Sequence, residues 1–278
     1  MDGFSRVEAG SPNHSEDAVT SGLVLIDGHH LYWEGHGPVE APCIILMHHG
    51  LGSVRSWRRQ IPALTQSGFR VMAFDRWGHG RSDIRPAFEE NFLLHDAEAS
   101  LQLLDELGIP RAYFIGHSDG GTIALIIASD HPERVLGLVV VAAHAYYEPK
   151  MARGLKTIQD SSRVPPVQTV LQREHGDRAN ALVDAWVSHW SKGDVELLSI
   201  MDRLEAIQAP TLVIQGEGDE HASPKHAEDI ADRIENSELW LIPGVGHMPP
   251  HEKPDEFNER VMCVLQIHRS MKEIIRSR

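Results

Sequence analysis

The chain has 278 residues, of which 41% are hydrophobic, and its 26 basic and 40 acidic side chains give a formal net charge of −14. A chain of this length can bury enough apolar surface for one large core. The acidic balance argues against nucleic acid or an anionic membrane as the main partner. We therefore expect a neutral or cationic small molecule as the partner.

The sequence carries no signal for membrane insertion or export. Its longest apolar stretch, 135–143, is far shorter than the roughly 18 residues that a membrane-spanning helix needs. The first residues lack the apolar segment of a signal peptide, which indicates a cytoplasmic protein. Cys43 and Cys263 have no C-x-x-C spacing, so we expect two buried thiols without a redox role.

The predicted strands begin after a tail. Residues 1–20 have no hydrophobic periodicity and are rich in Gly, Ser, Pro, Asn and Asp, which predicts a flexible segment. The next two apolar runs flank Asp27-Gly28 and predict a hairpin, whereas later runs are apolar on both sides, as in buried parallel strands. The eight predicted strands are 23–26, 31–34, 44–47, 71–74, 112–115, 138–141, 212–214 and 239–242.

Helical patterns lie between the later strands, at 57–66, 91–107, 122–129, 224–234 and 254–271. Pro224 and Pro254 stand in the first turns of two of them, where a helix has no use for the missing amide proton. Alternating strands and helices predict an α/β fold with a mostly parallel eight-stranded sheet and helices on both faces.

One segment interrupts this alternation. Residues 149–208 show no strand pattern but several helical stretches, separated by Pro165-Pro166, Gly176 and Gly193. We expect a short helical lid that shapes a pocket and excludes water. The core would then comprise residues 21–148 and 209–278.

A candidate nucleophile follows the strand predicted at 112–115. The sequence Gly116-His117-Ser118-Asp119-Gly120 matches G-x-S-x-G between a strand and a helix. Such a sharp turn needs glycines two residues on either side of the serine, because strand and helix approach each other closely there. We expect Ser118 to be presented at the carboxyl edge of the sheet.

A carboxylate and a histidine follow two later strands. Asp219 comes after the strand at 212–214 and His247 after the strand at 239–242, so the chain order is Ser, Asp, His. This order fits the nucleophile-elbow enzymes and excludes the chymotrypsin and subtilisin arrangements. The competing acids are Glu217 and Glu220, and the competing histidines are His221 and His251.

Two backbone amides are candidates for holding an oxyanion. The loop His49-Gly50-Leu51-Gly52 follows the strand at 44–47, and we assign one donor to Leu51. The second donor would be the amide of Asp119, directly after the nucleophile. The histidine pairs at 29–30 and 48–49 lack the spacing of metal ligands, so we expect neither a metal nor another cofactor.

Together, these motifs and the stretch Asp75-Arg76-Trp77-Gly78-His79-Gly80 resemble the α/β-hydrolase fold superfamily over nearly everything after residue 22. Within it, the chain is most similar to the biphenyl hydrolase-like group that includes valacyclovir hydrolase, through 118–121, 142–146 and 210–219. The usual D-x-R-G-x-G pattern has its arginine one place early, at Arg76. Haloalkane dehalogenases and epoxide hydrolases of this fold carry Asp at the elbow, so Ser118 argues against their chemistry.

The resemblance implies hydrolysis of small carboxylic esters through an acyl-enzyme. It also implies that the carboxylate of Asp119 pairs with the amino group of α-amino acid esters, although a carboxylate that only binds neighbouring loops fits the sequence equally well. A carbon–carbon bond hydrolase and a triad-retaining ligand receptor remain alternatives.

Four further residues are candidates for the acyl pocket or for packing of the lid: Tyr146, Met151, Trp186 and Trp190. The oligomeric state is open.

Overall fold

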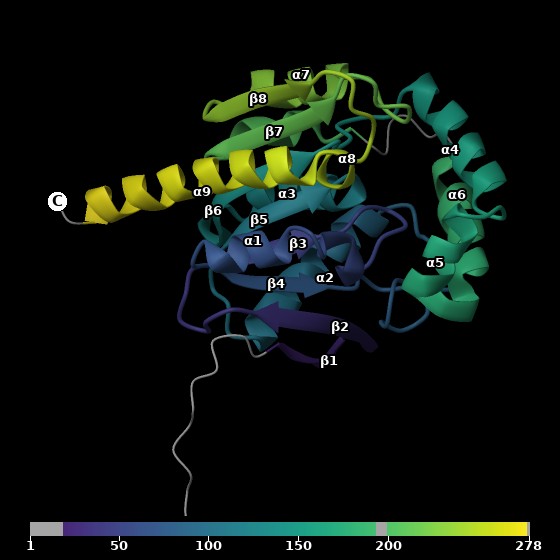
Figure 1. Ribbon diagram of the computed structural model, residues 1–278, viewed down its shortest axis with the longest axis horizontal. Coiled ribbons are helices and arrows are strands. Elements are labelled where there is room, and N and C mark those ends of the chain that lie inside the picture. The colour runs from purple at the N-terminus through teal and green to yellow at the C-terminus, as the bar shows by residue number, and fades with distance from the viewer. Residues whose placement is uncertain (1–18, 193–198, 277–278) are drawn as a thin grey trace, which may run out of the picture.

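The structure, a computed structural model, describes residues 19–192 and 199–276 and is built around one eight-stranded sheet (Figure 1). The strand order is β1-β2-β4-β3-β5-β6-β7-β8. β2 runs antiparallel to both β1 and β4, and all other neighbours are parallel. The strands are β1 (Thr20–Ile26), β2 (His29–His36), β3 (Cys43–Met47), β4 (Arg70–Phe74), β5 (Ala112–His117), β6 (Val135–Val141), β7 (Thr211–Gly216) and β8 (Ser237–Ile242).

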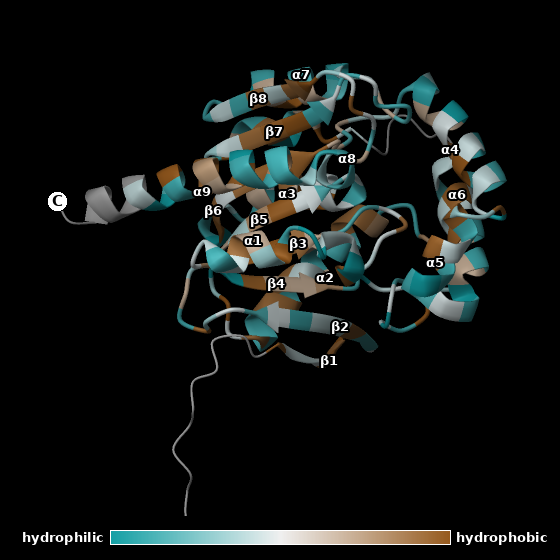
Figure 2. Ribbon diagram, viewed as in Figure 1, coloured by the Kyte–Doolittle hydropathy of each residue, from teal (hydrophilic) through white to brown (hydrophobic). Residues whose placement is uncertain are grey.

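Helices cover both faces of the sheet, as predicted. α1 (Ile61–Gln66) and α9 (Pro254–Arg276) cover one face, and α2 (Phe92–Glu106), α3 (Asp119–Asp130) and α7 (Lys225–Arg233) cover the other (Figure 1). Alternate residues of β3 pack on opposite faces of the sheet. Ile44 packs into the hydrophobic cluster under α1 and α9, and Ile45 packs into the cluster under α2 and α3. In Figure 2 the central strands are accordingly hydrophobic along most of their length.

The predicted hairpin joins β1 and β2 at Asp27 and Gly28, whose φ angles of 47° and 83° are those of a tight two-residue turn. The tail prediction of 1–20 is partly outside the described residues, and Thr20 already belongs to β1. Gly193 also lies outside the described residues.

Two predictions need correction. A continuous helix at 57–66 is wrong: a 3-10 turn, η1 (Val54–Trp57), is separated from α1, because Pro62 has no amide proton to continue a helix from 57. Cys43 is buried, and its burial raises the thiol pKa to about 12. Cys263, however, is exposed on the outer side of α9 rather than buried.

Between β6 and β7, the helices α4 (Pro149–Ser161), α5 (Val167–His175) and α6 (Ala179–Trp190) stand beside the carboxyl ends of the parallel strands (Figure 1). We call these three helices the cap. In the described parts of the chain, no helix is both long and apolar enough to cross a bilayer. The short remaining helices are η2 (Pro132–Arg134), η3 (Gly176–Arg178), η4 (Met201–Ala206) and α8 (Pro249–Glu252).

Candidate active site

Ser118 stands on a strained turn between β5 and α3. Its φ of 53° and ψ of −120° lie outside the regions that non-glycine residues favour. A Cβ atom at Gly116 would lie 2.2 Å from the carbonyl oxygen of Gly120, and one at Gly120 would lie 2.2 Å from that of Met47. Only glycine fits at either position, so the G-x-S-x-G spacing follows from the packing of β3, β5 and α3.

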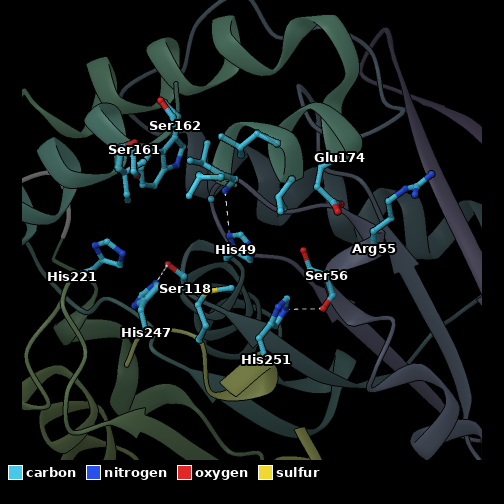
Figure 3. Close-up of a pocket in the computed structure, with 18 of the residues that line it drawn as sticks. His49, Arg55, Ser56, Ser118, Ser161, Ser162, Glu174, His221, His247 and His251 are labelled. Atoms are coloured by element: carbon cyan, nitrogen blue, oxygen red, sulfur yellow. Dashed lines mark hydrogen bonds between the residues drawn. The ribbon is translucent and has the colours of Figure 1, made fainter. Parts of the chain in front are cut away.

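The structure brings Ser118, His247 and Asp219 together in one hydrogen-bonded row (Figure 3). His247 Nε2 lies 3.1 Å from Ser118 Oγ, and His247 Nδ1 lies 2.8 Å from Asp219 Oδ2. The other carboxylate oxygen of Asp219 accepts hydrogen bonds from the amides of His221 and Ala222, at 2.8 and 3.0 Å. These bonds fix the carboxylate toward the imidazole.

The four residues that compete for the roles of acid and base lie outside this hydrogen-bonded row. Glu217 is exposed, and Glu220 accepts a hydrogen bond of 3.1 Å from the amide of His247. His251 donates to the carbonyl of Ser56 at 2.9 Å. The ring of His221 meets that of His247 edge to face at 4.7 Å, and its Nε2 lies 3.5 Å from Glu220 Oε1. None of the four takes the place of Asp219 or His247 in the row.

The electrostatics favour an ion pair between His247 and Asp219. Burial by itself would lower the pKa of His247, but the negative charge of Asp219 and the hydrogen bond to it outweigh burial and raise that pKa above 6.5. Burial would likewise raise the pKa of Asp219, yet the His247 charge and the hydrogen bonds from His247, Ala222 and His221 hold it below its usual value. This environment stabilises an imidazolium.

The loop after β3 is held by histidines that the sequence did not single out. His79 Nε2 donates to the carbonyl of Gly50 at 2.8 Å, and His175 Nε2 donates to the carbonyl of Leu51 at 3.0 Å. In a trans peptide the N–H points opposite to the preceding C=O, so fixing the Gly50 carbonyl toward His79 turns the amide of Leu51 away from His79. That amide makes one long hydrogen bond of 3.4 Å, to His49 Nδ1.

The amide of Asp119 is the first of α3, where helical amides lack intrahelical partners. It therefore has the character of an anion-binding donor beside Ser118.

The early arginine of the 75–80 stretch has a structural role. Arg76 is buried, and its Nη1 donates to Asp96 Oδ2 at 2.9 Å. Its Nη2 donates to the carbonyl of His49 at 3.2 Å and lies 4.0 Å from Asp119 Oδ2. Arg76 thus supports the loop after β3 and places a positive charge next to Asp119 from inside the protein.

A cavity of about 500 Å³ opens between Ser118 and the cap. Of the predicted pocket residues, Met151 and Trp186 line it. Tyr146 and Trp190 do not: the Tyr146 hydroxyl donates to Asp229 at 2.7 Å, and Trp190 packs against Phe92 and His144. Trp190 was predicted to line the pocket, but the stripe on α6 turns toward the core beyond Trp186. Tyr146 precedes α4 and is held outside the cavity by its bond to Asp229.

The carboxylate of Asp119 also does not reach the cavity. Its Oδ2 accepts a hydrogen bond of 2.8 Å from Trp186 Nε1, and the side chain is fully buried. Trp186 lines the cavity, whereas Asp119 does not. The arrangement agrees with the alternative in which Asp119 binds neighbouring elements only.

Among the described residues, no three His, Cys, Asp or Glu side chains are grouped so that they could hold a metal ion.

Comparison with known proteins places the chain among hydrolases. A mouse protein named serine hydrolase BPHL is 31% identical over 90% of this chain and 87% of its own length. The chain belongs to the α/β-hydrolase fold family.

Further comparisons agree with this membership. The family model for the alpha/beta hydrolase fold matches residues 42–165. A putative carbamate hydrolase, RutD of Variovorax paradoxus, is 28% identical over 84% of this α/β hydrolase and 96% of its own length. The crystal structure of a hydrolase from Pseudomonas aeruginosa superposes with a TM-score of 0.73 and 26% identity, covering 88% of this chain and 98% of that one.

Proposed function

We propose that this α/β hydrolase is a serine esterase that cleaves carboxylic esters of small molecules through an acyl-enzyme. The observation that carries the proposal is the position of His247, within hydrogen-bonding distance of both Ser118 and Asp219. A nucleophile, a base and a group that orients the base form the triad by which many serine enzymes carry out acyl transfer. The cavity that reaches Ser118 supplies room for a small substrate.

In this mechanism His247 takes the proton of Ser118 as the serine oxygen attacks the ester carbonyl. Asp219 stabilises the imidazolium, and the amides of Leu51 and Asp119 hold the oxyanion. His247 then gives the proton to the leaving alcohol, which departs and leaves the acyl group on Ser118. A water molecule, deprotonated by His247, releases the acid and regenerates the serine. No cofactor enters any step.

Carbamate hydrolysis is the second candidate, favoured by the relatives that carry this name. A carbamate carbonyl is attacked in the same geometry and gives the same oxyanion, so the site fits both substrates. A carbon–carbon bond hydrolase and a ligand receptor with little turnover use the same residues. Steady release of product over many turnovers would argue against a ligand receptor.

The experiment compares purified wild type with Ser118→Ala on a panel of esters, carbamates and a vinylogous β-diketone. Ser129→Ala is the matched control, because Ser129 is buried at the far end of α3 and its hydroxyl bonds to Ile126 and Asp130 of the same helix. We expect linear ester turnover that falls on the order of 10³- to 10⁶-fold in Ser118→Ala alone. Cleavage of the diketone or the carbamates without ester turnover would replace the proposal with the corresponding alternative.

A further inference from the structure

The cavity above Ser118 ends in a group of arginines. Arg55, Arg58 and Arg173 line it at one end, and the same three residues line a second cavity of about 450 Å³ that adjoins the first. Figure 3 shows Arg55 at the end of the cavity opposite His221. The three side chains therefore stand at the junction of the two cavities, in a chain whose overall charge is −14.

These arginines are poorly compensated by the protein. Arg173 lies 3.6 Å from Glu174, but neither Arg55 nor Arg58 forms an ion pair with a carboxylate of the described residues. Glu174 is the acidic residue that lines the first cavity, and its Oε2 accepts a hydrogen bond from Ser53. The junction thus keeps a net positive charge.

His251 lies beside this group. Burial lowers the pKa of His251, the nearby Arg58 and Arg59 lower it further, and the hydrogen bond to Ser56 and the charge of Glu174 act in the opposite direction. In the second cavity, Glu34 is already engaged by Tyr32 and Arg81. The three arginines therefore outnumber the acidic residues that line the two cavities, Glu174 and Glu34.

The cap side of the first cavity is largely apolar. The cap contributes Leu155 and Ile158 from α4, and Val167, Val170 and Leu171 from α5. Val167 and Val170 are 39% and 45% exposed, so the apolar wall continues to the surface. A ligand that follows the cavity would meet an apolar wall along the cap and positive charge at the junction.

We propose that the substrate is an amphiphilic anionic ester whose carboxylate or phosphate is bound by Arg55, Arg58 and Arg173 while its ester carbonyl lies at Ser118. Arginine suits this role because its planar guanidinium binds either anion with two parallel hydrogen bonds. The inference rests on the proposed ester hydrolysis and specifies its substrate class. It departs from the expectation of a neutral or cationic substrate, which considered only the charge of the whole chain.

The test compares matched esters that differ only in the distal group. On the acyl side these are monomethyl and dimethyl suberate. On the alcohol side they are butyrate esters of 6-hydroxyhexanoic acid, 6-hydroxyhexyl phosphate, hexanol and 6-aminohexanol. We expect wild type to favour an anionic ester over its neutral partner by about tenfold in kcat/KM and to disfavour the amine. The carboxylate and phosphate members identify which anion is preferred.

The variants Arg55→Ala, Arg58→Ala and their combination should lower the anionic-to-neutral ratio of kcat/KM, and most strongly in the combination, which leaves Arg173 as the remaining arginine of the three. Raising the ionic strength should lower the ratio in wild type too, because the arginines are exposed. Arg111→Ala is the control: it removes the same charge from an exposed position that lines neither cavity, and should keep the wild-type ratio.

If both anionic series react no faster than their neutral partners while the neutral esters turn over, the arginine inference is wrong and the proposed esterase stands. If the ratio survives the loss of both Arg55 and Arg58, the preference has another origin and the assignment to these residues is wrong. If wild type hydrolyses no ester of either series, the proposed function itself is contradicted.

Discussion

The indole Nε1 of Trp186 donates a hydrogen bond of 2.8 Å to Oδ2 of Asp119. This bond joins α6 of the cap to the first residue of α3, directly beside the nucleophile. With Arg76 Nη2 at 4.0 Å, the carboxylate already has a neutral donor and a countercharge from the protein. Its other oxygen, Oδ1, is buried without a hydrogen-bond partner among the described residues, but Asp119 does not line the cavity that reaches Ser118.

Asp119→Ala should therefore lower kcat/KM for an α-amino acid ester and for its amine-free isostere by the same factor. It should also lower the free energy of unfolding by about 1–3 kcal/mol, because the buried donor of Trp186 loses its acceptor. Paired kinetics and urea unfolding measure the two effects. A loss confined to the amino acid ester would restore Asp119 as a substrate-binding residue.

The pH dependence follows from the raised pKa of His247. The base must be neutral to accept a proton, so kcat/KM for a neutral ester should rise with pH through an apparent pKa above 6.5 and then level off. In Asp219→Asn the residual activity should show a lower apparent pKa, because the charge that favours the imidazolium is gone. An unchanged apparent pKa in this variant would show that Asp219 does not influence the protonation of the base.

His79 is predicted to position the oxyanion loop through the carbonyl of Gly50. His79→Ala should lower kcat for a neutral ester by about tenfold or more while KM changes little, since an oxyanion donor acts mainly in the transition state. His95→Ala, at an exposed site on α2, is the control. Equal changes in kcat and KM, or a loss explained by partial unfolding, would argue against this positioning role.

Asp96 joins two buried arginines, Arg76 and Arg85, at 2.9 and 2.7 Å. Asp96→Ala should lower the free energy of unfolding by about 3–5 kcal/mol, because buried Arg76 loses its nearest carboxylate and buried Arg85 retains only its pair with the exposed Glu89. Asp105→Ala breaks only an exposed pair with Arg134 and should cost about 1 kcal/mol or less. Chemical denaturation compares the two variants directly, and similar losses would contradict the importance of the buried network.

The fold was largely readable from the sequence, because buried parallel strands are apolar on both sides and the turn at Ser118 requires its glycines. The positions just after two later strands also indicated which acid and which histidine would join the serine in the active site. The roles of Arg76, His79 and His175 were not readable, since each binds a backbone carbonyl of the 48–51 loop from a distant part of the chain. Residue type and spacing carry no signal for such contacts.

The pocket was harder to predict for a related reason. Periodicity placed Trp186 and Trp190 on one face of a helix, but a helix face does not show where the cavity ends. In the structure Trp186 borders the cavity and Trp190 packs into the core. The charge at Arg55 and Arg58 was hidden by the acidic composition of the whole chain.

The most direct measurement of the central claim is covalent labelling by a fluorophosphonate probe, read by intact mass and peptide mapping. The account predicts a single adduct on Ser118, slow labelling in His247→Ala, and no adduct in folded Ser118→Ala. An adduct mapped to another residue, or equal labelling of Ser118→Ala, would contradict the assignment of Ser118 as the nucleophile.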